Sequence, residues 1–415
     1  MRIAKVEAFL LSCPLPEPLT LRYHGGERTI LKRDAMLIRV TTDQGLVGWA
    51  PGQGSEKAHR HIQSKVTPFL VGQLLNDPDL LRVKFYQVFP EEPEVRKAYA
   101  MVEIALYDLA AQDQGVPVSE LLGGRDRDRI KLYGSGGMYM PPEQYAEEAA
   151  AVQELGYRAY KMRPGLGPVD DLRTVQLMRE ATEPDFGLMV DAHTWWRMGD
   201  LSYTPETVAR LAQDLAEFDI EWLEEPLPPD DHEAYARLRA ESDVPLASGE
   251  HEPSDERFFH LIANECVDFV QADLICQGGY YSGRRVLNET ARQDLRFAFH
   301  SWGTELEVMV AAQLGICYPE PVAEWLEYPL YRRPGVPVMY PFPLAQEILA
   351  EPLEIEGGDL VVPRTPGLGV KINEKVIEKY PWIPGPWSRF KLESPAGVWD
   401  VSGDHSVRWA GTADH

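Results

Sequence analysis

Two patterns of apolar positions divide the chain. Apolar and polar residues alternate along 2–12 and 34–50, which predicts β-strands because successive strand side chains point to opposite faces. Residues 98–114 instead carry apolar side chains at three- and four-residue steps up to Gly115, which predicts a helix that ends there. We therefore expect an α+β module over residues 1–125.

Two breaks interrupt the strand patterns of this module. A turn at Asp43, Gln44 and Gly45 indicates that the second strand is one arm of a hairpin. Residues 22–29, between the two strands, are polar and contain glycine, which predicts a loop.

From about residue 130 onward, strand patterns alternate with amphipathic helical patterns. The strand candidates are 130–136, 158–163, 186–193, 220–226, 244–250, 268–274, 296–302 and 322–328. Strand–helix alternation favours a parallel sheet, and eight units favour an α/β barrel of the (β/α)8 type over an open doubly wound sheet. The early strands are not followed by a GxGxxG or Walker motif, which argues against a nucleotide-binding fold.

Composition narrows the class of protein. The formal net charge of −24 over 415 residues argues against a nucleic acid or an anionic membrane as partner. The N-terminal segment lacks the pattern of a signal peptide, and no apolar run is long enough to predict a membrane span. Four scattered cysteines without CxxC spacing indicate reduced thiols, so we expect a cytoplasmic protein.

Titratable residues stand at the ends of most predicted barrel strands. They recur every 23 to 33 residues, about one per strand–helix unit, and they are Lys161, Asp191, Glu224, Glu250, Asp273, His300 and Glu327. In a barrel the carboxyl ends of the strands converge on one rim, where catalytic residues lie. The spacing therefore predicts seven ionisable groups around a single mouth.

Asp191, Glu224 and Glu250 end consecutive predicted strands and should be neighbours at the rim. Carboxylates this close repel one another unless a cation neutralises them, and hard oxygen ligands suit Mg²⁺. Taken singly, each acid is more often a helix N-cap or a solvated loop charge. Three of them in register with the strand period favour a metal site.

The remaining strand-end residues suggest proton transfer. Asp273 can hydrogen-bond His300 and fix the imidazole tautomer for general acid–base work. Lys161 and Arg163 lie two residues apart on one predicted strand, so they share a face. We expect them to face a substrate carboxylate and the negative charge that develops on it. In the alternative interpretation they only pair with the acidic ring.

Eight short stretches carry a resemblance that covers most of the chain: ELLGGRDR, YKMRPGLGP, LMVDAH, WLEEPLPPDD, SGEHE, QADLICQGG, EWLEYP and PGLGVKIN. In this order and spacing they resemble the enolase superfamily, mandelate-racemase subgroup, and within it the sugar-acid dehydratases, especially L-rhamnonate dehydratase-like proteins. The resemblance implies an α+β capping domain (1–125) over a modified TIM barrel, (β/α)7β (126–345). It also implies that residues 346–415 return to the cap and that the chain forms a homo-oligomer.

The resemblance assigns roles to the strand-end residues. It implies one Mg²⁺ per subunit on the ligands Asp191, Glu224 and Glu250. It also implies a catalytic dyad of His300 and Asp273, with Glu327 hydrogen-bonded to a substrate carboxylate oxygen.

One position departs from the racemases of the subgroup, which carry Lys-x-Lys where this chain has Lys161-Met162-Arg163. Arginine is effectively always protonated, so a two-base racemase is disfavoured and a single-face mechanism with His300 fits better. His193, two residues past Asp191, is a further candidate for proton transfer, as in related mannonate dehydratases. The candidate substrate-binding residues are Arg22, His24 and Arg28 in the predicted loop, and Trp195, His251 and Trp302.

These residues predict a Mg²⁺-dependent hydro-lyase that converts a sugar acid (an aldonate) to a 2-keto-3-deoxy acid. The base removes the C2 proton, a metal-stabilised enediolate forms and the 3-hydroxyl leaves. A racemase, epimerase or cycloisomerase on the same scaffold is the nearest alternative. A non-catalytic sugar-acid binding protein is an alternative of another class.

Overall fold

The computed structural model describes residues 1–332, 339–394 and 397–403. Eight parallel strands form a closed barrel in which β11 pairs back to β4. They are β4 (Arg129–Met138), β5 (Ala159–Arg163), β6 (Gly187–Asp191), β7 (Trp222–Glu224), β8 (Leu246–Ser248), β9 (Phe269–Ala272), β10 (Arg296–Phe299) and β11 (Ala323–Pro329).

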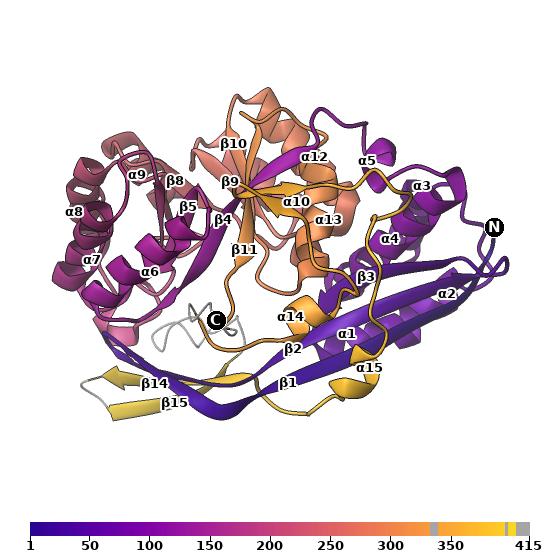
Figure 1. Ribbon diagram of the computed structural model, residues 1–415, viewed down its shortest axis with the longest axis horizontal. Coiled ribbons are helices and arrows are strands. Elements are labelled where there is room, and N and C mark those ends of the chain that lie inside the picture. The colour runs from indigo at the N-terminus through magenta and orange to yellow at the C-terminus, as the bar shows by residue number, and fades with distance from the viewer. Residues whose placement is uncertain (333–338, 395–396, 404–415) are drawn as a thin grey trace.

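Helical segments connect consecutive barrel strands (Figure 1). They are α6 (Pro142–Glu154), α7 (Pro168–Ala181), α8 (Pro205–Leu215), α9 (His232–Glu241), α10 (Asp255–Ala263), α11 (Leu274–Gln277) with α12 (Gly279–Arg292), and α13 (Glu305–Gly315). Short 3₁₀ turns, η2 (Gly199–Leu201) and η3 (Ala216–Phe218), flank α8. Eight strands with seven helical connections confirm the expected (β/α)7β barrel.

One inward side chain from each strand fills the barrel below its rim. This layer consists of Tyr133, Ala159, Met189, Trp222, Ala247, Phe269, Ala298 and Trp325. Side chains two positions apart on a strand share a face, so the next inward residue lies one layer closer to the rim. Lys161, Asp191 and Glu224 are such residues, each two past a layer member. The aromatic layer thus closes the barrel beneath the charged groups.

An antiparallel sheet forms the capping domain and confirms the second half of the expected fold. Its strands are β1 (Ile3–Tyr23), β2 (Gly26–Thr42), β3 (Val47–Gln53), β14 (Ser388–Ser394) and β15 (Gly397–Gly403). The helical segments packed with it are α1 (Glu56–His61), the π-helical turn η1 (Ile62–Val66), α2 (Thr67–Leu70), α3 (Pro78–Val88), α4 (Pro93–Gln114) and α5 (Val118–Leu121). As predicted, α4 ends at Gly115, which adopts a left-handed conformation (φ 70°).

The prediction of a loop at 22–29 is wrong. β1 and β2 pair continuously to Tyr23 and Gly26, and only His24 and Gly25 form the tip. Cross-strand pairing explains the polar composition, because charged side chains line up between strands; Lys391 of β14, for example, hydrogen-bonds Glu27 of β2.

The chain returns from the barrel to the cap. The connecting elements are α14 (Leu344–Glu347), β12 (Ile355–Glu356), β13 (Asp359–Val361) and α15 (Val376–Lys379). β14 then pairs with residues 26–30 of β2 on the edge opposite β1, the same edge that pairs with β3 farther along, so the C-terminal stretch extends the capping sheet. Residues 395–396 and 404–415 of that stretch lie outside the described residues.

A buried arginine of the cap, ion-paired within the cap, also hydrogen-bonds the barrel. Arg82 of α3 donates to Glu103 of α4 at 2.6 Å, and also to the carbonyl of Gly278 and the hydroxyl of Ser282 on the barrel side. Such a pair is costly to break, since removing one partner leaves a buried charge. Across the described ranges, no helix is long and apolar enough to cross a membrane.

Candidate active site

Lys161 lies among the acids of the rim with its side chain fully buried. Its Nζ is 2.7 Å from Glu224 Oε1, 3.2 Å from Glu327 Oε1 and 3.8 Å from Asp191 Oδ2. Burial alone would lower the pKa of Lys161, but Glu224 and Glu327 outweigh it and raise that pKa well above its usual value. The ammonium therefore links three strand ends.

Arg163 is held on several sides. Nε lies 3.1 Å from Asp191 Oδ2, Nη2 lies 3.3 Å from Glu327 Oε1, and the guanidinium stacks on the Trp302 ring at 3.8 Å. Burial opposes its charge, yet Asp191 and Glu327 raise the pKa of Arg163. Lys161 and Arg163 thus pair with the acidic ring here, and Arg163 is a fixed cation rather than a base.

Glu224 has both carboxylate oxygens engaged. Oε1 accepts from Lys161, while Oε2 accepts from Trp222 Nε1 at 2.9 Å and from Gln271 Nε2 at 2.8 Å. Gln271 was not predicted from the sequence, because only ionisable strand-end residues were considered as site residues. Its position two residues before Asp273 in the same strand pattern places it on the same face and could have indicated it.

The structure brings His300 and Asp273 together. His300 Nδ1 lies 2.8 Å from Asp273 Oδ2, and Asp273 Oδ1 accepts two backbone N–H groups at the start of α11. These bonds fix the carboxylate, which in turn orients the imidazole. His300 Nε2 lies 2.9 Å from Glu250 Oε2; burial would lower the pKa of His300, but Glu250 and Glu327 raise it well above its usual value.

A second imidazole lies beside the predicted metal ligands. His193 Nδ1 is 2.7 Å from Asp191 Oδ1, and the side chain is 12% exposed. Burial lowers the pKa of His193, although Asp191 opposes the shift. The rim therefore holds two histidines, each oriented by an aspartate.

Charge at the rim is unbalanced. Two fixed cations, Lys161 and Arg163, face five carboxylates: Asp191, Glu224, Glu250, Asp273 and Glu327. Burial, with Asp191 and Glu250 nearby, raises the pKa of Glu224 even though Lys161 opposes this. The arrangement is one that a bound cation would stabilise.

The chain matches two family descriptions along most of its length. "Enolase C-terminal domain-like" matches residues 144–376, and "Mandelate racemase / muconate lactonizing enzyme, N-terminal domain" matches residues 10–123. The chain belongs to the enolase superfamily.

Members of the superfamily with different activities are similar to this chain. D-galactarolactone cycloisomerase of Agrobacterium fabrum is 28% identical over 392 residues, covering 92% of this chain and 99% of that protein. D-xylonate dehydratase of Haloferax volcanii is 28% identical, and the match covers 83% of this chain and 85% of that protein. The structure of the 3,6-anhydro-D-galactonate cycloisomerase from Zobellia galactanivorans has a TM-score of 0.78 at 28% identity, covering 92% of this chain and 99% of that one.

Two sets of residues could hold a metal in this superfamily member. The predicted set consists of Asp191 and Glu224, which pair in register on adjacent strands, and Glu250 on the next unit; its ligands are all oxygens, the type that Mg²⁺ prefers. Glu225, Glu250 and His251 have ligand atoms within 4.8 Å of one another. That mixed oxygen and nitrogen set suits a softer cation better than Mg²⁺.

His251 does not stand free to bind a ligand. Its Nδ1 lies 2.6 Å from Glu225 Oε2, and its Nε2 lies 2.7 Å from Arg197 Nη2. Because a guanidinium only donates, Nε2 accepts and Nδ1–H donates to Glu225. Both ring nitrogens of His251 are thereby engaged, and Nδ1 also lies 3.3 Å from Glu250 Oε1.

Two predicted substrate contacts are corrected. The Arg22 side chain is 88% exposed and lies 3.9 Å from Glu27, because it continues the outward face of β1. Trp195 is buried in the core and donates to Asp171 of α7 at 2.9 Å, because the turn after β6 directs its ring away from the rim. His24 is an exposed residue at the hairpin tip whose backbone N–H donates to the carbonyl of Gly165 just past β5, and its contact with substrate stays a prediction.

Arg28 and Trp302 do lie at the meeting of cap and barrel. Arg28 is buried and its Nη1 lies 3.8 Å from the sulfur of Met138, the last residue of β4. The Trp302 carbonyl accepts a hydrogen bond of 2.6 Å from Arg33 of β2. The cap therefore reaches the rim through β2, with two arginines.

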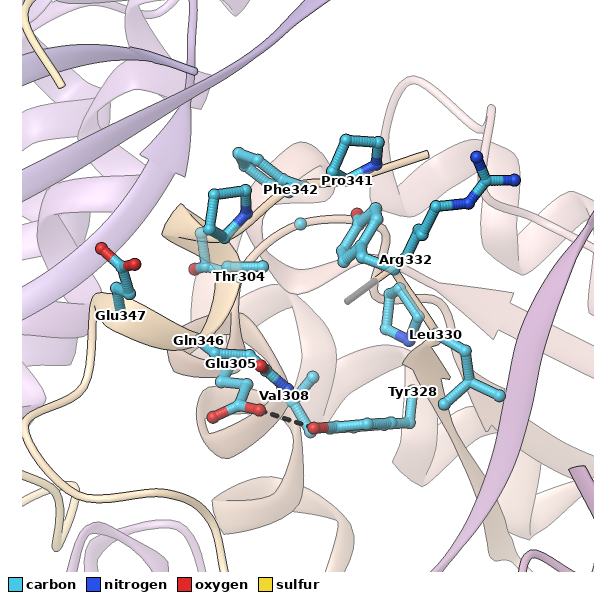
Figure 2. A pocket seen from close by; sticks show the side chains of 15 residues that line it. Thr304, Glu305, Val308, Tyr328, Leu330, Arg332, Pro341, Phe342, Gln346 and Glu347 are labelled. Carbon is cyan, nitrogen blue, oxygen red and sulfur yellow. Dashed lines mark hydrogen bonds between the residues drawn. The ribbon is translucent and has the colours of Figure 1, made fainter. Parts of the chain in front are cut away.

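A cavity of about 290 Å³ lies between the end of the barrel sheet and the segment that returns to the cap (Figure 2). Residues at the end of β11, the start of α13 and α14 line it, and within it the Tyr328 hydroxyl donates to Glu305 at 2.5 Å. None of the predicted site residues is among the described residues that line this cavity.

Proposed function

We propose that this enolase-superfamily enzyme dehydrates a sugar acid to a 2-keto-3-deoxy acid with Mg²⁺. The observation that carries the proposal is the pairing of one oriented base, His300 on Asp273, with a permanently protonated Arg163. This asymmetry supports proton transfer on one face of the substrate and disfavours inversion at C2.

Each residue has a part in the proposed reaction. Asp191, Glu224 and Glu250 would hold Mg²⁺, which supplies positive charge to the substrate carboxylate and so makes the adjacent proton more acidic. Nε2 of His300 takes the C2 proton. Lys161, Arg163 and Glu327 orient the carboxylate, and the two cations balance the charge that develops there.

Departure of the 3-hydroxyl needs a proton. His300 can return the proton it has taken, or His193 can supply one, since His193 is held by Asp191 beside the same strand ends. Loss of water then leaves an enol, which becomes the 2-keto-3-deoxy acid.

A cycloisomerase is the second candidate, because D-galactarolactone cycloisomerase is 28% identical over 92% of this chain. Both reactions can begin with proton removal next to a carboxylate and end with departure of an oxygen at the neighbouring carbon. They differ in whether that oxygen is a hydroxyl or part of a ring, and therefore in whether water is released.

The test is a screen with Mg²⁺ over five- and six-carbon sugar acids and their lactones, in H₂O and in D₂O. We expect one or a few acyclic acids to yield 2-keto-3-deoxy product, detected with a carbonyl reagent and by NMR. Ring opening of a lactone without release of water would favour the cycloisomerase. Deuterium at C2 without ketone would exclude both eliminations.

A further inference from the structure

Arg28 is a buried guanidinium whose charge is not matched. Among residues in the described ranges it forms no ion pair; Nε has no hydrogen-bond partner, and Nη1 reaches only the Met138 sulfur. Its flat faces lie 4.5 Å from the Trp387 ring and 4.9 Å from the Phe390 ring. Buried charges are normally paired, so a bound anion would stabilise this guanidinium.

The surroundings of Arg28 also favour a bound anion. Burial lowers the pKa of Arg28, and the neighbouring cations Arg33 and Arg197 lower it further, while the phenols of Tyr139 and Tyr340 oppose them. Arg197 is itself a cation and adds positive charge; its Nη2 is engaged with His251, and its buried Nε has no hydrogen-bond partner among the described residues. The cap side of the site is thus positive.

Arg28 also lies near the reacting groups. Met138, which it touches, pairs in register with Arg163, the cation bonded to Asp191. Arg197 approaches from the other side, where His251 stands 3.3 Å from Glu250. Arg28 therefore lies on the cap side of the barrel strand ends, next to Met138 at the end of β4.

From this placement we infer that Arg28, with Arg197 nearby, binds a second carboxylate of the substrate, at the end remote from the metal. The substrate is then a sugar diacid (an aldarate) rather than a monocarboxylic aldonate. A planar guanidinium binds a carboxylate through two parallel N–H···O bonds, and Arg197 adds a second positive charge nearby. This inference rests on the proposed function and narrows its substrate class.

The experiment compares six-carbon aldarates, the corresponding aldonates and 6-phosphoaldonates as substrates of the wild type and of Arg28→Met. We expect the wild type to prefer an aldarate, and R28M to lose about 10- to 100-fold in kcat/KM for it, mainly through KM, while aldonate turnover changes much less. Preference for aldonates, preference for phosphorylated acids, or an equal loss for all substrates would overturn the inference.

Arg39→Met is the matched control. Arg39 lies on the same strand and also stacks on two rings, those of Phe9 and Trp49, but it pairs with Glu7 away from the rim. We expect R39M to leave the substrate preference unchanged. Arg28→Lys should recover part of the aldarate preference, which a purely structural role would not require.

Binding separates this inference from the proposed reaction. Calorimetry with galactarate and gluconate in the presence of Mg²⁺, on the wild type and R28M, needs no turnover. If neither acid reacts yet galactarate binds in an Arg28-dependent way, the diacid site stands and the dehydratase proposal fails. If gluconate binds as tightly as galactarate, or R28M binds both as the wild type does, the diacid inference fails.

Discussion

The barrel rim and the hairpin of β1 and β2 in the cap balance their charges in opposite ways. At the rim, acids outnumber fixed cations, and Lys161 and Arg163 are each shared among several carboxylates. On the cap, Arg28 has no carboxylate partner in the described part of the chain, and Arg33 is satisfied by the Tyr340 hydroxyl and the Trp302 carbonyl.

This difference separates two tasks. An excess of negative charge on rigid strand ends suits a metal and proton transfer, which every substrate of the same reaction requires. An excess of positive charge on a hairpin suits recognition of the remote end of one substrate. We therefore propose that the barrel carries the chemistry and that the cap selects the substrate.

The largest effect should follow removal of the base from the rim. His300→Asn is expected to lower kcat by about a thousandfold or more, because the residue that takes the C2 proton is lost, while Mg²⁺ affinity changes little. Kinetics and calorimetry on the same preparation measure both. His61→Asn on α1 of the cap is the control. If H300N keeps most of the activity, His300 is not the base.

Replacing one metal ligand should have the next largest effect. Glu224→Gln is expected to weaken Mg²⁺ binding about a hundredfold, since a ligating charge is lost, and chelator treatment of the wild type should abolish turnover. Glu225→Gln, its neighbour, is the matched comparison by calorimetry. A larger loss for E225Q than for E224Q would show that Glu225, Glu250 and His251 hold the cation instead.

Arg163→Lys tests whether the rim needs a fixed cation. Lysine cannot keep the ring stacking and the paired contacts to Asp191 and Glu327, so dehydration should fall about tenfold to a hundredfold. Lysine can also accept a proton, so R163K should gain C2 deuterium exchange in D₂O. Unchanged dehydration without exchange would show that Arg163 has only a structural part.

The rim could be predicted from the sequence because its signal is periodic. One ionisable residue per strand–helix unit, and an inward neighbour two positions earlier, follow directly from barrel geometry, as for Lys161 above Ala159. Trp222 precedes Glu224 on the same strand, whereas Gln271 of β9 reaches Glu224 through a contact between strands that no single stretch contains, and that pairing was not predictable in this way.

The cap was harder to predict because its function depends on long-range pairing. Polarity at 22–29 indicated a loop, yet β14 arrives from residues 388–394 to make this stretch the inside of a sheet. That same pairing buries Arg28 against Trp387 and Phe390, and leaves Arg22 on the outer face. Neither outcome can be derived from residues 22–29 alone.

The smallest predicted effect concerns a buried acid away from the mouth. Glu148 of α6 accepts a hydrogen bond of 2.5 Å from Tyr160, and burial raises the pKa of Glu148 to about 8 although that bond opposes the shift. The folded chain then holds a proton that the unfolded chain releases above its ordinary pKa. Stability should therefore fall as pH rises from about 4.5 to about 8.

Glu148→Gln keeps the acceptor for Tyr160 and removes this titration. Near pH 5 the variant and the wild type should unfold at similar urea concentrations, and near pH 8 the variant should be more stable, by on the order of 2 kcal/mol. Equal curves at both pH values would show that Glu148 is ionised in the fold. A protonated Glu148 would set this acid apart from those of the rim. An isolated buried carboxylate takes up a proton, whereas the acids of the rim share the cations Lys161 and Arg163.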